Sequence, residues 1–239
     1  MKKETLKIKV EGEEITNLVY LPEGEIKGII LFCHGFPGTN RLNELKEEAA
    51  KRNFSLIEVN YRGDKLSEGK FSFFKAIKDI QAVAEKTRKE NPKTYFCGLG
   101  YSAGGLYTAN VARNKPELFD KVVFLSPVID SKFFSESPLM KELWEAAKNS
   151  IRLESKGFYE KEIQLMNEKF NAIDFAAEIK IRINIVQSEK DEVIPIKKVE
   201  EFYSKLTCEK NLSFIKDATH DLKGNEEELI KALFNEGEK

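Results

Sequence analysis

Ser102 lies in a segment whose pattern is typical of an activated nucleophile. Residues 100–104 read Gly-Tyr-Ser-Ala-Gly, which matches G-x-S-x-G, between an apolar run at 94–99 and a helical pattern at 103–114. A sharp turn from strand to helix holds a serine hydroxyl clear of a sheet, and the flanking glycines permit that turn. The segment therefore predicts a serine nucleophile, with a plain glycine–serine turn as the alternative.

A serine hydroxyl needs a base, and the chain has two histidines. His220 follows the last strand pattern, so we expect it at the carboxyl edge of the sheet, where Ser102 emerges. His34 lies in His-Gly-Phe-Pro-Gly after an earlier strand pattern, and we interpret it as an imidazole that shapes this loop or borders the substrate pocket. We expect the backbone N–H groups of Phe36 and Ala103 to bind an oxyanion. His220 is the predicted base.

The base in turn needs a carboxylate that holds its tautomer. Asp191 follows a strand pattern and precedes His220 by 29 residues, and Ser, Asp, His is one of the chain orders in which such triads occur. Asp130 follows the preceding strand pattern and is a rival. Asp217 and Asp221 flank His220 and are too local to reach its ring easily. We predict Asp191 as the acid.

The elements that must position these residues alternate between strand and helix patterns. Strand patterns lie at 6–12, 15–22, 28–33, 55–61, 94–99, 122–127, 183–188 and 212–216. Helical patterns lie at 41–52, 72–91, 103–114, 195–206 and 225–236. This alternation predicts an α/β fold, an eight-stranded, mostly parallel sheet flanked by helices, with the first two strands antiparallel. Arg182 and Asn184 suggest that one side of the seventh strand is less buried.

One segment is much longer than a normal crossover. Residues 131–180 separate the sixth and seventh strands and contain helical patterns at 137–150 and 159–170. We predict that they form a small helical lid over the sheet. Its aromatic residues suggest an apolar substrate pocket, although core packing explains them equally well. The expected pocket residues are His34, Tyr101, Phe133, Phe134 and Trp144.

Length and composition restrict the class of protein. The 239 residues favour a single domain over 1–239, and 39 Lys+Arg against 40 Asp+Glu give a net charge of -1. We therefore expect no nucleic-acid or membrane partner. The amino-terminal segment has a basic pair without an apolar core behind it, so we expect no signal peptide and a cytoplasmic protein.

Cofactor motifs are missing from the sequence. Cys33, Cys97 and Cys208 have no metal-ligand spacing, and we expect Cys33 and Cys97 to be buried, reduced thiols. No phosphate-cradling glycine motif is present either. We therefore predict neither a metal nor an organic cofactor.

Four stretches resemble the α/β-hydrolase superfamily, and most of all small carboxylesterases related to the prolyl oligopeptidase family. They are HGFPG at 34–38, NYRGDKLSEGKFS at 60–72, GYSAGG at 100–105, and SEKDEVIP together with the histidine of ATHDL. The resemblance implies that Ser102 is the nucleophile, Asp191 the acid and His220 the base. The strand before the acid usually ends in His-Gly and here ends in Gln187-Ser188. The chain has no counterpart of the β-propeller of the peptidase members, which favours an esterase.

The leading hypothesis is hydrolysis of a small-molecule carboxylic ester through an acyl-enzyme. Amide or peptide hydrolysis needs the same groups plus an anchor for a peptide terminus, for which Arg62 is the one candidate. A more ordinary interpretation of Arg62 is an ion pair that fixes its loop. Thioester cleavage, acyl transfer and a non-catalytic binding protein remain alternatives, and a homodimer is left open.

Overall fold

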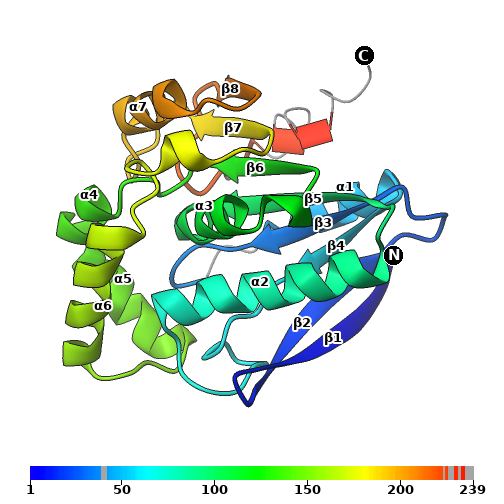
Figure 1. The fold of residues 1–239 in the computed structure, drawn as a ribbon, viewed down its shortest axis with the longest axis horizontal. Coiled ribbons are helices and arrows are strands. Elements are labelled where there is room, and N and C mark those ends of the chain that lie inside the picture. The colour runs from blue at the N-terminus through cyan, green and yellow to red at the C-terminus, as the bar shows by residue number, and fades with distance from the viewer. Residues whose placement is uncertain (39–41, 223, 226–228, 231–232, 235–239) are drawn as a thin grey trace.

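The computed structural model describes residues 1–38, 42–222, 224–225, 229–230 and 233–234. Its strands form one sheet in the order β1-β2-β4-β3-β5-β6-β7-β8 (Figure 1). β1 pairs antiparallel with β2 and β2 with β4, and the pairs from β4 to β8 are parallel. The strands are β1 (Lys2–Val10), β2 (Glu13–Leu21), β3 (Gly28–Cys33), β4 (Phe54–Glu58), β5 (Tyr95–Tyr101), β6 (Lys121–Leu125), β7 (Ile183–Ser188) and β8 (Lys210–Ile215). The predicted α/β fold is confirmed.

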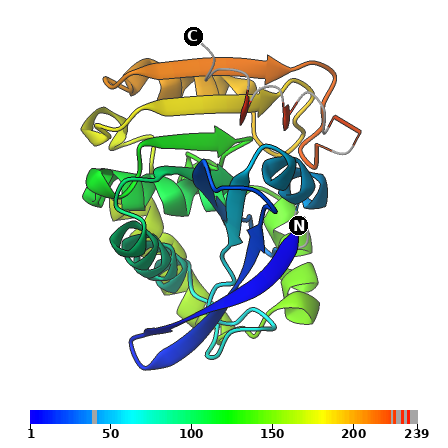
Figure 2. The ribbon, with the colours of Figure 1, turned by 90° about the vertical axis from the view of Figure 1, so that its right-hand side faces the viewer.

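Both faces of the central strands are buried. In β3, Ile29 and Leu31 belong to one hydrophobic cluster, and Ile30 and Phe32 belong to the other. Successive side chains of a strand point to opposite faces, so a sheet covered on both sides needs continuous apolar runs. Figure 2 shows helices on both faces of the sheet.

The covering helices divide between the two clusters. The first cluster contains residues of α2, α3 and α7, and the second contains residues of α1. These helices are α1 (Asn43–Lys51), α2 (Phe73–Glu90), α3 (Ala103–Asn114) and α7 (Ile196–Lys205). Each falls within a predicted helical range. The helix predicted at 225–236 lies largely outside the described residues.

Three helices lie between β6 and β7, at the edge where the parallel strands end (Figure 1). They are α4 (Ser131–Glu136), α5 (Leu139–Ser150) and α6 (Lys156–Lys169). We call residues 131–180 the helical insert. The sequence predicts α5 and α6 with slightly different ends, but it gives no helical pattern for α4. That the helical insert works as a lid stays a prediction.

The structure corrects two details of the predicted strands. β7 is buried along its whole length, and Asn184 is 2% exposed, because β6 and β8 flank it and helices cover it. Arg182 precedes the strand and forms an ion pair with Glu209. The first strand ends at Val10 rather than at residue 12, because Glu11 and Gly12 form the hairpin turn, with φ values of 52° and 90°.

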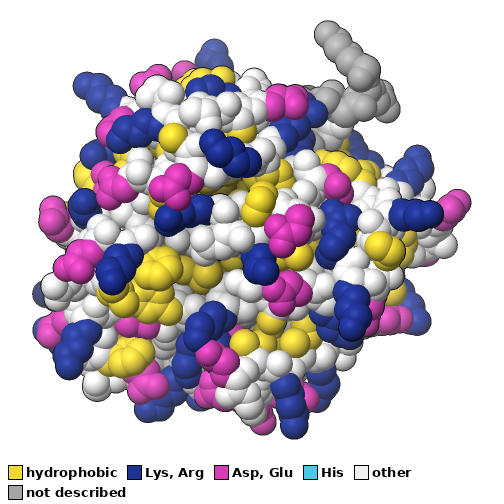
Figure 3. Space-filling model, viewed as in Figure 1, with side chains coloured by type: hydrophobic (Ala, Val, Ile, Leu, Met, Phe, Trp, Pro, Cys, Tyr) yellow, Lys and Arg dark blue, Asp and Glu magenta, His cyan; other side chains and the backbone are white. Residues whose placement is uncertain are grey.

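The three cysteines are free thiols, and Cys33 and Cys97 are buried, as predicted. Burial raises the pKa of Cys33 to about 12, so its reactive thiolate form is scarce at neutral pH. On the face seen in Figure 3, basic and acidic side chains are interspersed, in agreement with the balanced composition. None of the helices in the described ranges combines the length and the hydrophobicity that a membrane crossing needs.

Candidate active site

Ser102 occupies a strained turn between β5 and α3. Its φ of 53° and ψ of -124° are unusual for a residue with a side chain, and such strain persists where the surroundings enforce it. The turn lies so close against β3 that a Cβ atom on Gly104 would come within 1.9 Å of the Cys33 carbonyl oxygen. A Cβ on Gly35 would likewise lie 2.8 Å from the Ser102 Cβ. These glycines therefore allow the serine to stand at the end of the sheet.

The structure brings Ser102, His220 and Asp191 together. The Ser102 Oγ is 3.0 Å from the His220 Nε2, and the His220 Nδ1 is 3.0 Å from each carboxylate oxygen of Asp191. A carboxylate at Nδ1 favours the tautomer that carries its proton there, which leaves Nε2 to accept the hydroxyl proton. This arrangement can activate a serine hydroxyl as a nucleophile.

Asp191 is held by three donors besides His220. Its Oδ1 accepts hydrogen bonds from the N–H groups of Val193 at 2.9 Å and Ile194 at 2.8 Å, and its Oδ2 accepts one from the Gln187 Nε2 at 3.0 Å. The side chain is 0% exposed, so these donors compensate for its lost hydration. The sequence marks Gln187 only as a departure from the family pattern and gives no sign of its contact with Asp191.

Further contacts fix the loop that carries His220. The Tyr101 hydroxyl donates a hydrogen bond of 2.9 Å to the His220 carbonyl oxygen, and the two rings stack with centroids 5.5 Å apart. The His220 N–H donates to Glu192 at 3.3 Å. Tyr101, at the end of β5, thus also positions His220.

The rival carboxylates have other partners. Asp130 caps α4 through the Phe133 N–H at 3.1 Å and pairs with Lys198 at 2.7 Å. Burial acts to raise the pKa of Asp130, but the hydrogen bonds from Lys198 and from the Phe133 amide outweigh it and hold the pKa below its usual value. Asp217 pairs with Lys190 at 2.6 Å. Asp191 is the carboxylate that the structure places at the His220 ring.

The two expected oxyanion donors lie beside Ser102. Ala103 is the first residue of α3, where an N–H group has no acceptor within the helix and the helix dipole favours negative charge. Phe36 lies in the loop after β3, two residues beyond His34, and lines the same cavity as Ser102. The arrangement can place two backbone donors around a developing negative charge.

A cavity of about 170 Å³ opens at Ser102 and His220. Its apolar wall contains Phe36, Pro37, Phe134, Leu139, Leu143 and Val193, and Tyr101 and Asp221 also border it. Tyr101 and Phe134, two of the expected pocket residues, therefore line this cavity. Leu139 and Leu143 were missed, although they lie one helical turn apart on α5 and share one face.

The other three expected pocket residues lie elsewhere. His34 is buried, with its Nε2 3.0 Å from an Asp64 oxygen and its Nδ1 2.8 Å from the Gly35 carbonyl oxygen, as befits an imidazole that shapes the loop. Phe133 is 38% exposed on the surface of α4. The Trp144 ring packs against the Phe36 ring, with centroids 4.9 Å apart, and lines a different cavity.

Arg62 forms structural ion pairs. Its Nε donates to Asp79 at 2.8 Å, and its Nη1 lies 3.0 Å from Glu11 and 3.3 Å from Glu13. The side chain is 1% exposed. These contacts match the ordinary interpretation of Arg62, and the residue does not line the cavity at Ser102. Within the described ranges, no group of three His, Cys, Asp or Glu side chains is placed to hold a metal ion.

The chain matches the model of a known protein family. Residues 24–162, more than half of the chain, match the family model described as serine aminopeptidase, S33. The matched region contains Phe36 and Ser102 and ends before Asp191 and His220. No curated protein sequence matches the chain.

Many solved structures share the fold. The α/β hydrolase GrgF from Penicillium sp. sh18 is 15% identical, with 98% of this chain and 97% of that chain covered and a TM-score of 0.78. Est1E from Butyrivibrio proteoclasticus, with ferulic acid bound, is 19% identical, with 96% of each chain covered and a TM-score of 0.78. An α/β serine hydrolase homologue from Coxiella burnetii is 18% identical, with 99% and 98% covered and a TM-score of 0.70. At these identities the likeness establishes the fold.

Proposed function

Because this chain belongs to the serine aminopeptidase S33 family of α/β-hydrolases, we propose that it hydrolyses small carboxylic esters with Ser102, His220 and Asp191 as its catalytic triad. One observation carries the proposal. The Ser102 Oγ lies 3.0 Å from the His220 Nε2, and both residues line a small cavity with an apolar wall. An apolar acyl or aryl group fits such a wall better than a charged one does.

The proposed reaction proceeds through an acyl-enzyme. The His220 Nε2 takes the hydroxyl proton as Ser102 attacks the ester carbonyl carbon. The backbone N–H groups of Phe36 and Ala103 donate hydrogen bonds to the resulting oxyanion. Protonated His220, stabilised by Asp191, gives its proton to the departing alcohol. A water molecule, deprotonated by His220, then releases the acid and restores the serine.

The size of the cavity points to a short acyl group. A volume of about 170 Å³ lies below the roughly 300–1,000 Å³ typical of pockets for drug-sized ligands. We therefore propose that acetyl to butyryl esters, or compact aryl esters, are the preferred substrates. Est1E, whose structure holds ferulic acid, gives an example of a compact aromatic acid bound on this fold. The cytoplasmic location stays a prediction, and the homodimer stays open.

The direct test is hydrolysis of p-nitrophenyl esters from acetate to decanoate by the native chain and by Ser102→Ala. We expect kcat/KM to be highest for the short esters and to fall by about 10⁴-fold or more in the variant. Asp130→Asn is the matched control. The Asp130 carboxylate pairs with Lys198, so this substitution should leave kcat unchanged. Hydrolysis that survives in Ser102→Ala would contradict the triad.

Amide hydrolysis is the second candidate, favoured by the family description. An aminopeptidase needs a negative group for the substrate ammonium, and Asp221 borders the cavity next to His220. Arg62, the anchor considered from the sequence, is committed to Asp79. A kcat/KM for aminoacyl p-nitroanilides above that for p-nitrophenyl acetate, lost selectively in Asp221→Asn, would reverse our ranking.

Thioester cleavage and acyl transfer use the same triad and remain further alternatives. A non-catalytic role predicts no turnover of any of these substrates.

A further inference from the structure

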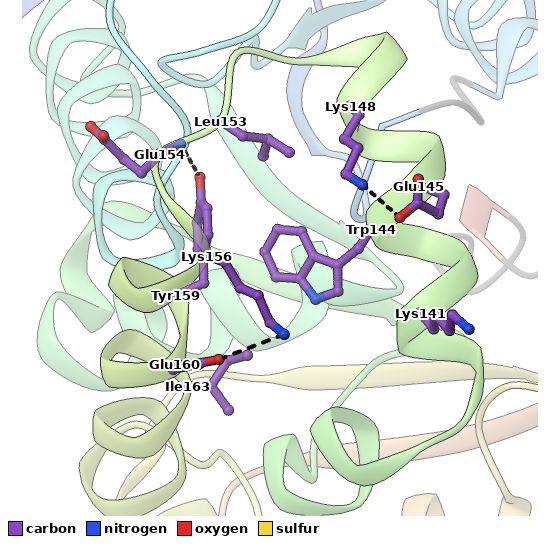
Figure 4. Close-up of a pocket in the computed structure, with 10 residues that line it drawn as sticks. All are labelled: Lys141, Trp144, Glu145, Lys148, Leu153, Glu154, Lys156, Tyr159, Glu160 and Ile163. Atoms are coloured by element: carbon purple, nitrogen blue, oxygen red, sulfur yellow. Dashed lines mark hydrogen bonds and ion pairs between the residues drawn. The ribbon is translucent and has the colours of Figure 1, made fainter.

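A second and larger cavity lies within the helical insert, between α5 and α6 (Figure 4). Its volume is about 590 Å³, against about 170 Å³ for the cavity at Ser102. The two cavities share no lining residue, since α5 gives Leu139 and Leu143 to one and Trp144 to the other. The proposed ester hydrolysis makes no use of this second cavity.

The walls of the second cavity are mainly apolar. Trp144 is half-buried, and Figure 4 shows its indole reaching into the space between the two helices, with Leu153, Tyr159 and Ile163 around it. The Tyr159 hydroxyl is already occupied, because it donates to the Phe71 carbonyl oxygen at 2.7 Å and accepts from the Glu154 N–H at 3.0 Å. The tyrosine therefore offers a ligand its ring rather than its hydroxyl.

Three lysines and three glutamates border this cavity, and Lys148 and Lys156 are the lysines nearest the Trp144 ring in Figure 4. The ammonium groups of Lys148 and Lys156 lie on opposite sides of the Trp144 indole in Figure 4. Lys148 pairs with Glu145 at 2.6 Å and Lys156 with Glu160 at 4.0 Å, and all four side chains are at least 60% exposed. Exposed pairs of this kind contribute only about 0–1 kcal/mol, so a ligand anion can replace either glutamate at little cost.

We propose that this cavity binds a small carboxylate with an apolar body, of the medium-chain fatty acid class, as an effector separate from the substrate. The apolar body lies against Trp144, Leu153 and Ile163. The carboxylate accepts a hydrogen bond from Lys148 or from Lys156, and that lysine exchanges its surface glutamate for the ligand.

The effector site has a physical route to the catalytic centre. The Trp144 ring forms an edge contact with the ring of Phe36, with centroids 4.9 Å apart. Phe36 supplies one of the proposed oxyanion donors, so a ligand that fixes Trp144 also restricts the loop that carries this N–H group. The effect on catalysis rests on the proposed function, whereas the binding does not.

The binding test uses Trp144 as its reporter, because it is the only tryptophan in the chain. Octanoate is titrated into Ser102→Ala, with 1-octanol as the uncharged counterpart. We expect a saturable blue shift of the fluorescence with octanoate, and a Kd about tenfold weaker for 1-octanol, since the charge-assisted hydrogen bonds are lost. An emission spectrum that octanoate leaves unchanged up to its solubility limit would overturn the proposal.

Variants locate the ligand. The double variant Lys148→Ala/Lys156→Ala should weaken octanoate binding about tenfold and leave 1-octanol binding unchanged. Lys161→Ala, an exposed lysine of α6 outside the cavity lining, is the matched control and should bind octanoate normally. The native chain phosphonylated at Ser102 should also keep its affinity for octanoate. Loss of binding on phosphonylation would place octanoate in the catalytic cavity and contradict a separate site.

Kinetics test the coupling. With p-nitrophenyl acetate as substrate, octanoate should change kcat and leave KM nearly constant, and the Lys148→Ala/Lys156→Ala variant should lose this response. A purely competitive effect would refute an effector role. If the native chain has no esterase activity, the fluorescence titrations still decide whether the second cavity binds carboxylates.

Discussion

At the scale of single residues, the site depends on how the buried Asp191 is oriented. Its Oδ2 contacts both the His220 ring and the Gln187 amide, each at 3.0 Å. The amide comes from the end of β7, a buried strand flanked by β6 and β8, whereas Asp191 and His220 lie in loops. Gln187 therefore anchors the proposed acid to the sheet.

We predict that Gln187→Met, which keeps the volume but removes the donor, lowers kcat about tenfold with KM little changed, because a hydrogen bond to a charged group contributes about 1.5–3 kcal/mol. Steady-state kinetics on p-nitrophenyl acetate and the rate of phosphonylation of Ser102 measure the effect. Ser188→Ala, on the next residue of β7, is the control and removes only a hydroxyl contact with Ser126. A variant as active as the native chain would show that the amide does not position Asp191.

At the scale of elements, α5 stands between two cavities. Leu139 and Leu143 face the cavity at Ser102, while Trp144 faces the second one. The helix is held to the rest of the molecule by aromatic contacts, such as that of Trp144 with Phe73 at 6.1 Å between centroids. Leu139 and Leu143 therefore limit the volume that is available to an acyl group at Ser102.

We predict that Leu143→Ala shifts the ester preference toward longer acyl chains. Shortening this wall residue makes room for additional methylene groups, each of which changes discrimination in an apolar pocket by about tenfold or more. The ratio of kcat/KM for p-nitrophenyl hexanoate to that for the acetate measures the shift. Glu142→Ala, on the exposed side of the same helix, should leave the ratio unchanged. The proposed pocket would be wrong if Leu143→Ala also left it unchanged.

At the scale of the whole molecule, Arg62 joins parts of the chain that are distant in sequence. It connects the loop after β4 to Asp79 of α2 and to Glu11 and Glu13 at the first hairpin. Asp79 is 0% exposed and receives both the Arg62 Nε and the Arg62 N–H at 2.8 Å. Removing Asp79 leaves the buried Nε and backbone N–H of Arg62 without their acceptor, while Glu11 and Glu13 still pair with its Nη1.

We predict that Asp79→Ala lowers the free energy of unfolding by about 3 kcal/mol, because the buried Nε and backbone N–H of Arg62 lose their acceptor. Urea denaturation followed by circular dichroism measures it. Glu90→Ala removes an exposed pair with Lys86 on the same helix and should change the stability by only about 0.5 kcal/mol. Equal effects of the two substitutions would contradict a structural role for the Arg62 pair.

The sequence by itself determined the fold and the identity of the candidate triad. Continuous apolar runs such as 28–33 specify buried strands because both faces of a parallel sheet are covered. The elbow at Ser102 is a local feature, in which a glycine pattern, a strand and a helix are adjacent in the chain. The choice of Asp191 and His220 followed from their positions after strands whose ends meet at one edge of the sheet.

Only the tertiary structure decided which side chains surround that centre. Trp144 and Leu143 are neighbours in sequence, yet they face different cavities, because the packing of α5 fixes its rotation about its own axis. Asn184 is buried because β8 completes the sheet beside it. Gln187 contacts Asp191 through a turn of the chain that no periodic pattern encodes. Local propensity specifies elements, whereas contacts between residues far apart in sequence depend on how those elements pack.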